Sequence, residues 1–335
     1  MKPLPVRGRG AQGNPANRFE GLELEREAWT AEDPGPETRL LRDRSRSIIS
    51  RNRSPDVGFE ASVNPYRGCE HGCVYCYARP THEYLGFSAG LDFESRILVK
   101  EDAPALLRRE LASPDWKPTV LVMSGVTDPY QPAERRLGIT RACLEVLADA
   151  RNPVAVITKS RLVTRDADHL ATLAAHGAAR VSVSVTTLDE SLRRILEPRA
   201  PTPGRRLDAI QELSAAGVPV GVMVAPVIPG LTEHEIPAIL ESAAAEGATH
   251  AAWIMLRLPH GVSEMFGAWL ETHFPDRKDK VLGRIRDVRG GRLNDPRFGS
   301  RMRGGVPLAD HVARLFRVSA RRFGLDGPRE PLSAA

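Results

Sequence analysis

The sequence contains little cysteine and no long apolar run, and each absence excludes a class of protein. Four cysteines in 335 residues, three of them crowded together, do not make the disulfide framework of a small secreted domain. No apolar run approaches the ~20 residues needed to span a bilayer, and residues 1–21 lack the apolar centre of a secretion signal. We therefore expect a cytoplasmic protein with reduced thiols and no membrane contact.

Charge is unevenly distributed along the chain. The net charge is +5, but residues 277–335 carry 15 lysines and arginines against six acidic residues, a balance of +9 that leaves the rest of the chain at −4. A basic terminal region suits phosphate contacts with DNA or RNA, and it equally suits an ordinary solvated surface. Charge alone leaves a nucleic-acid partner open.

Three of the four cysteines lie in one segment, NPYRGCEHGCVYCY at residues 64–77. Cys69, Cys73 and Cys76 form a C-x3-C-x2-C run whose glycines let the chain turn tightly. Three thiolates from one loop can hold three irons of a [4Fe–4S] cluster and leave the fourth iron open. The alternative is a zinc site made by the same cysteines with His71, in a non-catalytic, nucleic-acid-binding protein. Zinc modules usually spread their ligands over two knuckles, and the sequence has no second one.

Tyr75, directly before the last cysteine, completes the pattern C-x3-C-x-aromatic-C. With it, the run resembles the cluster loop of the radical S-adenosylmethionine (SAM) superfamily. The stretches NPYRGCEHGCVYCYARPTHEYL and GLDFESRILVK are similar to the branch related to spore photolyase, and the resemblance extends over roughly residues 38–260.

This resemblance implies a radical SAM enzyme. A [4Fe–4S] cluster, reduced by an external donor of the flavodoxin or ferredoxin type, would cleave SAM to methionine and a 5′-deoxyadenosyl radical. The radical would abstract hydrogen from a substrate that the resemblance does not identify, with DNA or RNA as one candidate.

Short runs rich in Val and Ile alternate with segments of helical pattern. This alternation predicts a parallel sheet covered by helices, with strands at residues 57–63, 119–123, 154–158, 180–185, 218–224 and 249–256. Six such units, together with the resemblance, predict an α/β fold that forms a partial (β/α)6 TIM-like barrel of the radical SAM type.

We expect three regions: a basic, partly flexible N-terminal extension (1–54), the barrel (55–260) and a helical, basic C-terminal extension (261–335). Residues 1–37 are rich in Pro, Gly and charge and are expected to be flexible or loosely docked. The basic stretch 39–53 is predicted to form a surface helix or an arm along a nucleic acid.

Barrel enzymes place their chemistry at the carboxyl ends of the strands, which selects the remaining candidates. By the resemblance, the loop after the second strand contacts the amino group of SAM through Ser124, Thr127 and Asp128, with Glu134 in reserve. Lys159 pairs with the SAM carboxylate. Ser182 and Ser184 share one face of the fourth strand and reach the ribose, and Arg199 binds the SAM carboxylate or a substrate phosphate.

Aromatic residues complete the set of candidates. By the resemblance, Tyr75 packs near the adenine of SAM, and Tyr77 shields the cluster or faces the substrate. Spore photolyase carries a hydrogen-donor cysteine in the loop that here spans residues 124–134, and this chain has none there. Its absence argues against thymine-dimer repair and makes Tyr77 and Tyr130 the candidate hydrogen donors, while Cys143 is expected to be a core residue.

Overall fold

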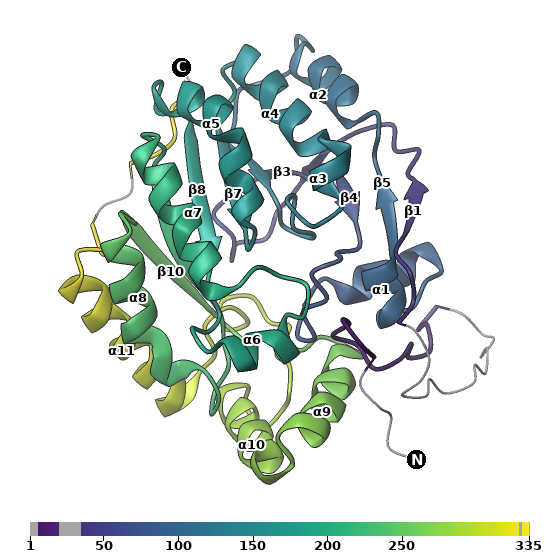
Figure 1. Cartoon of the computed structure of the whole chain (residues 1–335), viewed down its shortest axis with the longest axis vertical. Coiled ribbons are helices and arrows are strands. Elements are labelled where there is room, and N and C mark those ends of the chain that lie inside the picture. The colour runs from purple at the N-terminus through teal and green to yellow at the C-terminus, as the bar shows by residue number, and fades with distance from the viewer. Residues whose placement is uncertain (1–5, 20–34, 328–329, 335) are drawn as a thin grey trace.

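The computed structural model describes residues 6–19, 35–327 and 330–334, and its centre is a seven-stranded sheet (Figure 1). Six strands run parallel in the order β10-β9-β8-β7-β6-β3, and β2 pairs antiparallel with β3. Within the described residues the edge strands β10 and β2 do not pair with each other, so the predicted partial barrel is confirmed. The strands are β2 Ile49–Arg51, β3 Ala61–Val63, β6 Leu121–Met123, β7 Val154–Thr158, β8 Ala179–Ser184, β9 Val220–Val227 and β10 His250–Met255.

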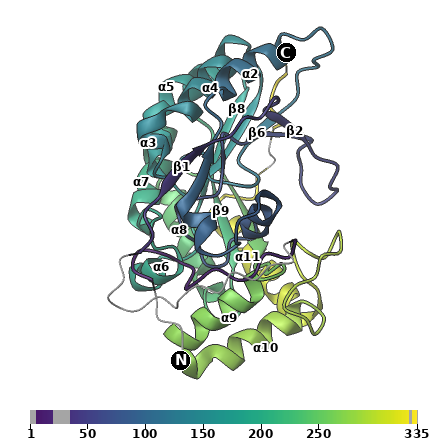
Figure 2. The same cartoon turned by 90° about the vertical axis from the view of Figure 1, so that its right-hand side faces the viewer.

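Helices cover one face of this sheet, and Figure 2 shows α4, α5 and α7 on the same side of the strands. The burial pattern of β7 explains the arrangement, because Val154, Val156 and Thr158 are buried while Ala155 and Ile157 are half-buried. The valines pack in the main core under the helices, and the alternate positions line the opposite, concave face. The covering helices are α2 Ala103–Leu111, α4 Ile139–Asp149, α5 Ala167–Ala174, α7 Pro203–Ala215 and α8 Ile236–Ala245.

Shorter elements surround the cysteine segment. A three-stranded sheet has the order β1-β5-β4, and short helices precede or follow the strand-end loops. These elements are β1 Arg39–Arg42, β4 Tyr66–Arg67, β5 Arg96–Val99, α1 Leu91–Ser95, α3 Glu134–Leu137, α6 Glu190–Leu196 and 3-10 helices at Arg79–Leu85, Arg161–Asp166, Glu233–Glu235 and Pro275–Arg277.

The prediction of a helix over residues 39–53 is wrong. The segment forms β1, which pairs in parallel with β5, and then β2, which pairs with β3 in the other sheet. Its apolar residues come as two pairs, Leu40–Leu41 and Ile48–Ile49, with six residues between the pairs. That spacing does not give the stripe at every third or fourth position on which an amphipathic helix depends.

The C-terminal extension is helical and closes the β10 edge of the sheet. It contains α9 Val262–His273, α10 Lys278–Val288 and α11 Val306–Arg322. The Ala251 N–H donates to Leu325 O (3.2 Å), and the Met255 N–H donates to Met302 O (2.9 Å). These bonds satisfy groups that an open sheet edge would leave exposed.

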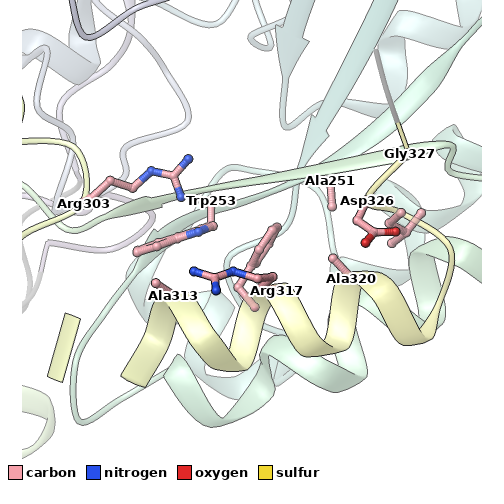
Figure 3. A pocket seen from close by; sticks show the side chains of 10 residues that line it. Ala251, Trp253, Arg303, Ala313, Arg317, Ala320, Asp326 and Gly327 are labelled. Atoms are coloured by element: carbon pink, nitrogen blue, oxygen red, sulfur yellow. The ribbon is translucent and has the colours of Figure 1, made fainter. Parts of the chain in front are cut away.

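Between β10 and α11 lies a cavity of about 290 Å³ (Figure 3). The Trp253 ring forms part of its wall, with the Arg303 guanidinium 4.6 Å from the ring centroid and Phe316 at 6.1 Å.

None of the helices in the described part of the chain is both long enough and apolar enough to cross a membrane.

Candidate active site

The loop that carries the three cysteines follows β3 and β4 at the carboxyl end of the sheet. The Cys69 N–H donates to Phe93 O (2.9 Å). Gly68 has φ +81°, and a Cβ there would lie 2.9 Å from the same oxygen. Gly72 has φ +67°, and a Cβ there would lie 2.7 Å from Glu94 Oε2. Both positions therefore require glycine, and the loop is fixed against residues 93–94.

The three thiols of this loop are free and largely withdrawn from solvent. Cys69 and Cys73 are each 7% exposed, and Cys76 is partly buried. Burial raises the pKa of all three thiols, that of Cys73 to about 12. Buried thiols of this kind ionise readily only when a metal is bound to them. A set of three sulfur donors from one loop fits an iron–sulfur cluster.

The zinc alternative finds no support in this geometry. Among residues 6–19, 35–327 and 330–334, no three His, Cys, Asp or Glu side chains are gathered so that they could hold a metal ion. His71, the proposed fourth zinc ligand, is buried and pairs with Asp128 through Nδ1 (Nδ1–Oδ2 3.4 Å). A [4Fe–4S] cluster places each thiolate on a separate iron and does not require one shared centre.

Tyr75 anchors a buried polar network. Its hydroxyl donates to the Glu197 carboxylate and lies 3.2 Å from Thr186 Oγ1. Glu197 also pairs with Arg206, and both side chains are fully buried. Burial by itself would raise the pKa of Glu197, but Arg206 and Lys159 outweigh it and hold that pKa well below its ordinary value. The network fixes the Tyr75 ring beside the cysteine loop.

Lys159, at the end of β7, belongs to the same network. Its ammonium lies 3.1 Å from each of three acceptors, Glu197 Oε1, Thr186 Oγ1 and Ala225 O. It also lies 5.8 Å from the centroid of the Tyr75 ring. An ammonium has three donors, so pairing with the SAM carboxylate requires one of these bonds to be exchanged.

The loop after β6 is held against the cysteine segment. Ser124 has φ +141°, and its hydroxyl donates to Thr127 O (3.3 Å). Thr127 is buried and donates to Tyr66 O (3.1 Å). The Tyr77 hydroxyl donates to Gly125 O (2.5 Å). Of the predicted residues of this loop, Ser124 and Asp128 thus stay partly exposed and Thr127 is buried.

Asp128 joins two strand ends to the cysteine loop. Its carboxylate accepts from the Tyr130 N–H (2.9 Å), the Thr158 hydroxyl (2.7 Å) and the Lys159 N–H (2.8 Å). Burial alone would raise the pKa of Asp128, but the contact with His71 and these hydrogen bonds lower it. The structure therefore places this carboxylate as an anchor of His71.

Ser182 and Ser184 lie on the concave face of β8. The register aligns Ser182 with Ile157 of β7 and with Gly221 of β9, and Ser184 with Met223. Val181 and Val183, which alternate with the serines, are fully buried in the core. The position that a side chain at Gly221 would take is filled by the His250 ring, whose Nε2 would lie 2.3 Å from an added Cβ.

Two other predicted charges are engaged in ion pairs. Arg199 pairs with Glu70 of the cysteine loop (3.0 Å) and donates to Thr38 Oγ1 (3.1 Å). Glu134 is fully buried and pairs with Arg165 (2.7 Å). In this structure each of them fastens one loop to another.

The two candidate hydrogen donors occupy different environments. Tyr130 is fully buried, whereas Tyr77 is 47% exposed. The Arg257 guanidinium lies 5.3 Å from the centroid of the Tyr77 ring. Of the two, Tyr77 is the one that the structure leaves open to a substrate. Cys143 is buried in the main core, as predicted.

Residues 6–19, expected to be flexible or loosely docked, pack closely against the cysteine loop. The Gly10 and Ala11 N–H groups donate to the Glu94 carboxylate (2.9 and 2.7 Å). Glu94 also pairs with Arg79 (2.6 Å), and both side chains are fully buried. A Cβ at Gly10 would lie 1.7 Å from Gly72 O, so the two backbones touch. The rest of the expected flexible segment, residues 1–5 and 20–34, lies outside the described residues.

Sequence reasoning did not assign roles to Glu94, Arg79, Glu197 or Arg206. The closely spaced glycines of the sequence RGRGAQG were the signal for the contact between the N-terminal segment and the cysteine loop, since glycines permit two backbones to approach. The partner of each buried charge is distant in the chain or lies in an unremarkable helix. No local pattern marks such a pair.

Comparisons with known proteins agree with this site. Residues 63–243, more than half of the chain, match the family model of the radical SAM superfamily. The chain is 38% identical over 242 residues to the uncharacterized protein Rv2578c of Mycobacterium tuberculosis, covering 71% of this chain and 70% of that protein. It is 28% identical over 196 residues to the uncharacterized protein MJ0683 of Methanocaldococcus jannaschii, covering 58% of this chain and 70% of that protein.

Solved structures share the fold at low sequence identity. Spore photoproduct lyase in complex with dinucleoside spore photoproduct superposes with a TM-score of 0.60 at 16% identity, covering 85% of this chain and 79% of that one. A variant of that lyase with bound AdoMet and dinucleoside spore photoproduct gives 0.59. The family model and the cysteine loop agree: this chain belongs to the radical SAM superfamily and is a radical SAM enzyme.

Proposed function

We propose that Cys69, Cys73 and Cys76 hold a [4Fe–4S] cluster that binds SAM. The observation that carries the proposal is the position of three thiols, two buried and one partly buried, on one glycine-bent loop at the carboxyl end of an open parallel sheet. When bound, the cluster supplies one electron to SAM, which is cleaved to methionine and a 5′-deoxyadenosyl radical that abstracts hydrogen from a substrate. The electron comes from an external one-electron carrier of the flavodoxin or ferredoxin type.

The protein's own residues orient the reactants and exclude water. Tyr75, fixed by Glu197, presents its ring beside the last cysteine. Lys159 exchanges its bond to Ala225 O for the SAM carboxylate, while Glu197 keeps its pairing with Arg206.

A nucleic-acid substrate is the candidate that the rim of the concave face favours. Tyr77 is exposed beneath Arg257, and Phe298 is 61% exposed with the Arg301 guanidinium 4.5 Å from its centroid. Arg257 lies close enough to Arg301 for their charges to interact, which together with burial lowers the pKa of Arg257. Adjacent aromatic faces and guanidinium groups are the features on which unpaired bases stack and phosphates bind.

This substrate class is tested by fluorescence anisotropy with single-stranded DNA and RNA oligonucleotides at increasing salt. Phosphate contacts release counterions, so the affinity should fall steeply as the salt concentration rises. Tyr77→Ala should weaken binding at every salt concentration without changing the slope, because it removes a stacking surface and no charge. Binding that is absent or insensitive to salt would direct the search to protein or small-molecule substrates.

The enzyme class is tested by SAM cleavage. The protein is reconstituted anaerobically with iron and sulfide and reduced with dithionite, and 5′-deoxyadenosine is quantified after SAM is added. Release by the wild type and by Cys143→Ala, with loss in Cys73→Ala, is the expected result. A colourless protein that holds zinc and leaves SAM intact would refute the proposal.

A further inference from the structure

A cavity of about 430 Å³ lies beside the cysteine loop, and the mechanism above does not use it. Its walls come from four loops at the carboxyl end of the sheet: Glu70 and His71 of the cysteine loop, Arg135 and Arg136 of α3, Ser160 after β7 and Arg199 after α6. The cavity therefore reaches the cysteine loop at the residues directly after Cys69.

The cavity carries an excess of positive charge. Three guanidinium groups line it. Within the described chain, Glu70 of the cavity pairs with Arg199 and neutralises that one charge. Arg135 and Arg136 are exposed and form neither a salt bridge nor a side-chain hydrogen bond with another described residue. Two uncompensated positive charges remain for a partner.

The other approaches to the cysteine loop are already occupied or assigned. On the Gly72 side, Gly10 and Ala11 cover the loop and bind Glu94. The concave face, with Ser182 and Tyr77, serves SAM and the substrate under the proposed function. The basic cavity adjoins the loop on a further side, at Glu70 and His71, where neither residues 6–19 nor the concave face is involved.

We infer that this basic cavity is the docking site of an acidic one-electron carrier protein, with Arg135 and Arg136 as its main contacts. The inference rests on the proposed function. In the transfer the carrier is oxidised by one electron and the group held by the three cysteines accepts it. No bond forms or breaks at the interface and no proton is required. Opposite charges at such an interface accelerate encounter and make binding sensitive to salt.

The test compares two charge-reversal pairs of the full chain. Arg135→Glu/Arg136→Glu changes the cavity, and Arg321→Glu/Arg322→Glu changes an adjacent exposed pair at the end of α11. Binding of an oxidised acidic flavodoxin and of an oxidised acidic ferredoxin is measured by calorimetry at low and high salt, without SAM. Release of 5′-deoxyadenosine is then measured with each reduced carrier and, separately, with dithionite.

The cavity variant should bind the preferred carrier about tenfold more weakly or worse, since reversing two charges turns two attractive contacts into repulsive ones. Its carrier-driven rate should fall in proportion, while its dithionite-driven rate and every property of the α11 variant stay at wild-type values. Equal carrier binding by both variants, or no salt-sensitive binding of either carrier to the wild type, would overturn the inference. Failure of the wild type with dithionite would instead refute the proposed function, and the binding comparison would still stand.

Discussion

Removing the charge of Glu94 should destabilise the protein severely, because that carboxylate is the buried centre on which the N-terminal segment and the cysteine loop meet. In Glu94→Gln the guanidinium of Arg79, fully buried at 2.6 Å from Glu94, loses its counterion. Leaving one partner of a buried ion pair uncompensated costs about 3–5 kcal/mol. The amide also replaces an acceptor with a donor facing the Gly10 or Ala11 N–H. We expect a loss of about 3–5 kcal/mol in the free energy of unfolding, out of a typical total of about 5–15 kcal/mol.

Urea denaturation followed by circular dichroism measures this loss, with two controls. Asp149→Asn breaks the exposed pair with Arg108 (2.9 Å) and should cost less than about 1 kcal/mol. Glu94→Gln/Arg79→Met removes both buried charges but leaves the Cys73, Ala89 and Gly90 carbonyls without the Arg79 donors, so it should recover only part of the lost stability. A Glu94→Gln protein no less stable than Asp149→Asn would refute the reasoning that this buried pair organises the loop.

Three further predictions concern the same region. Gly10→Ala places a Cβ 1.7 Å from Gly72 O, whereas the Cβ of Gly13→Ala has nothing within 4 Å. After reconstitution, a chelator should therefore extract iron faster from Gly10→Ala than from Gly13→Ala. Equal rates would count against a protective role of residues 6–19. Lys159→Met should weaken SAM binding, measured by calorimetry, about tenfold, as the loss of a charge-assisted hydrogen bond predicts, and an unchanged affinity would remove Lys159 from the SAM site. The pKa of Asp128 is lowered, so its stabilising effect is present above its ordinary pKa of 3.8 and is lost as the pH falls below it. The difference in urea midpoint between wild type and Asp128→Asn should therefore shrink on acidification. A constant difference would contradict the assignment.

The sequence predicted those parts of the structure that depend on local pattern. Residues 154–158 became β7 because a Val- and Ile-rich run between helical segments suits a strand buried in a parallel sheet. The helical segments expected between the strands also occur, among them α4, α5, α7 and α8. The cysteine loop could be located because its ligands are neighbours in the chain.

Features that depend on distant partners could not be predicted in this way. Tyr75 and Glu197 are separated by 122 positions and Arg199 and Glu70 by 129, so nothing near either residue signals its pairing. Lys159 was assigned to the SAM carboxylate, and Arg199 to that carboxylate or a substrate phosphate, whereas the structure gives each an internal partner. The segment 39–53 took its conformation from pairing with β5 and β3, which overrode its own weak pattern.

The measurement that tests the central claim most directly is electron paramagnetic resonance of the reconstituted, reduced protein before and after SAM is added. A reduced [4Fe–4S] signal that SAM perturbs in the wild type and in Cys143→Ala, and that is lost in Cys73→Ala, is the result we predict. It would show that Cys69, Cys73 and Cys76 hold a cluster with an iron open to SAM. A reduced signal that SAM leaves unchanged, or a protein that takes up no iron, would contradict the account.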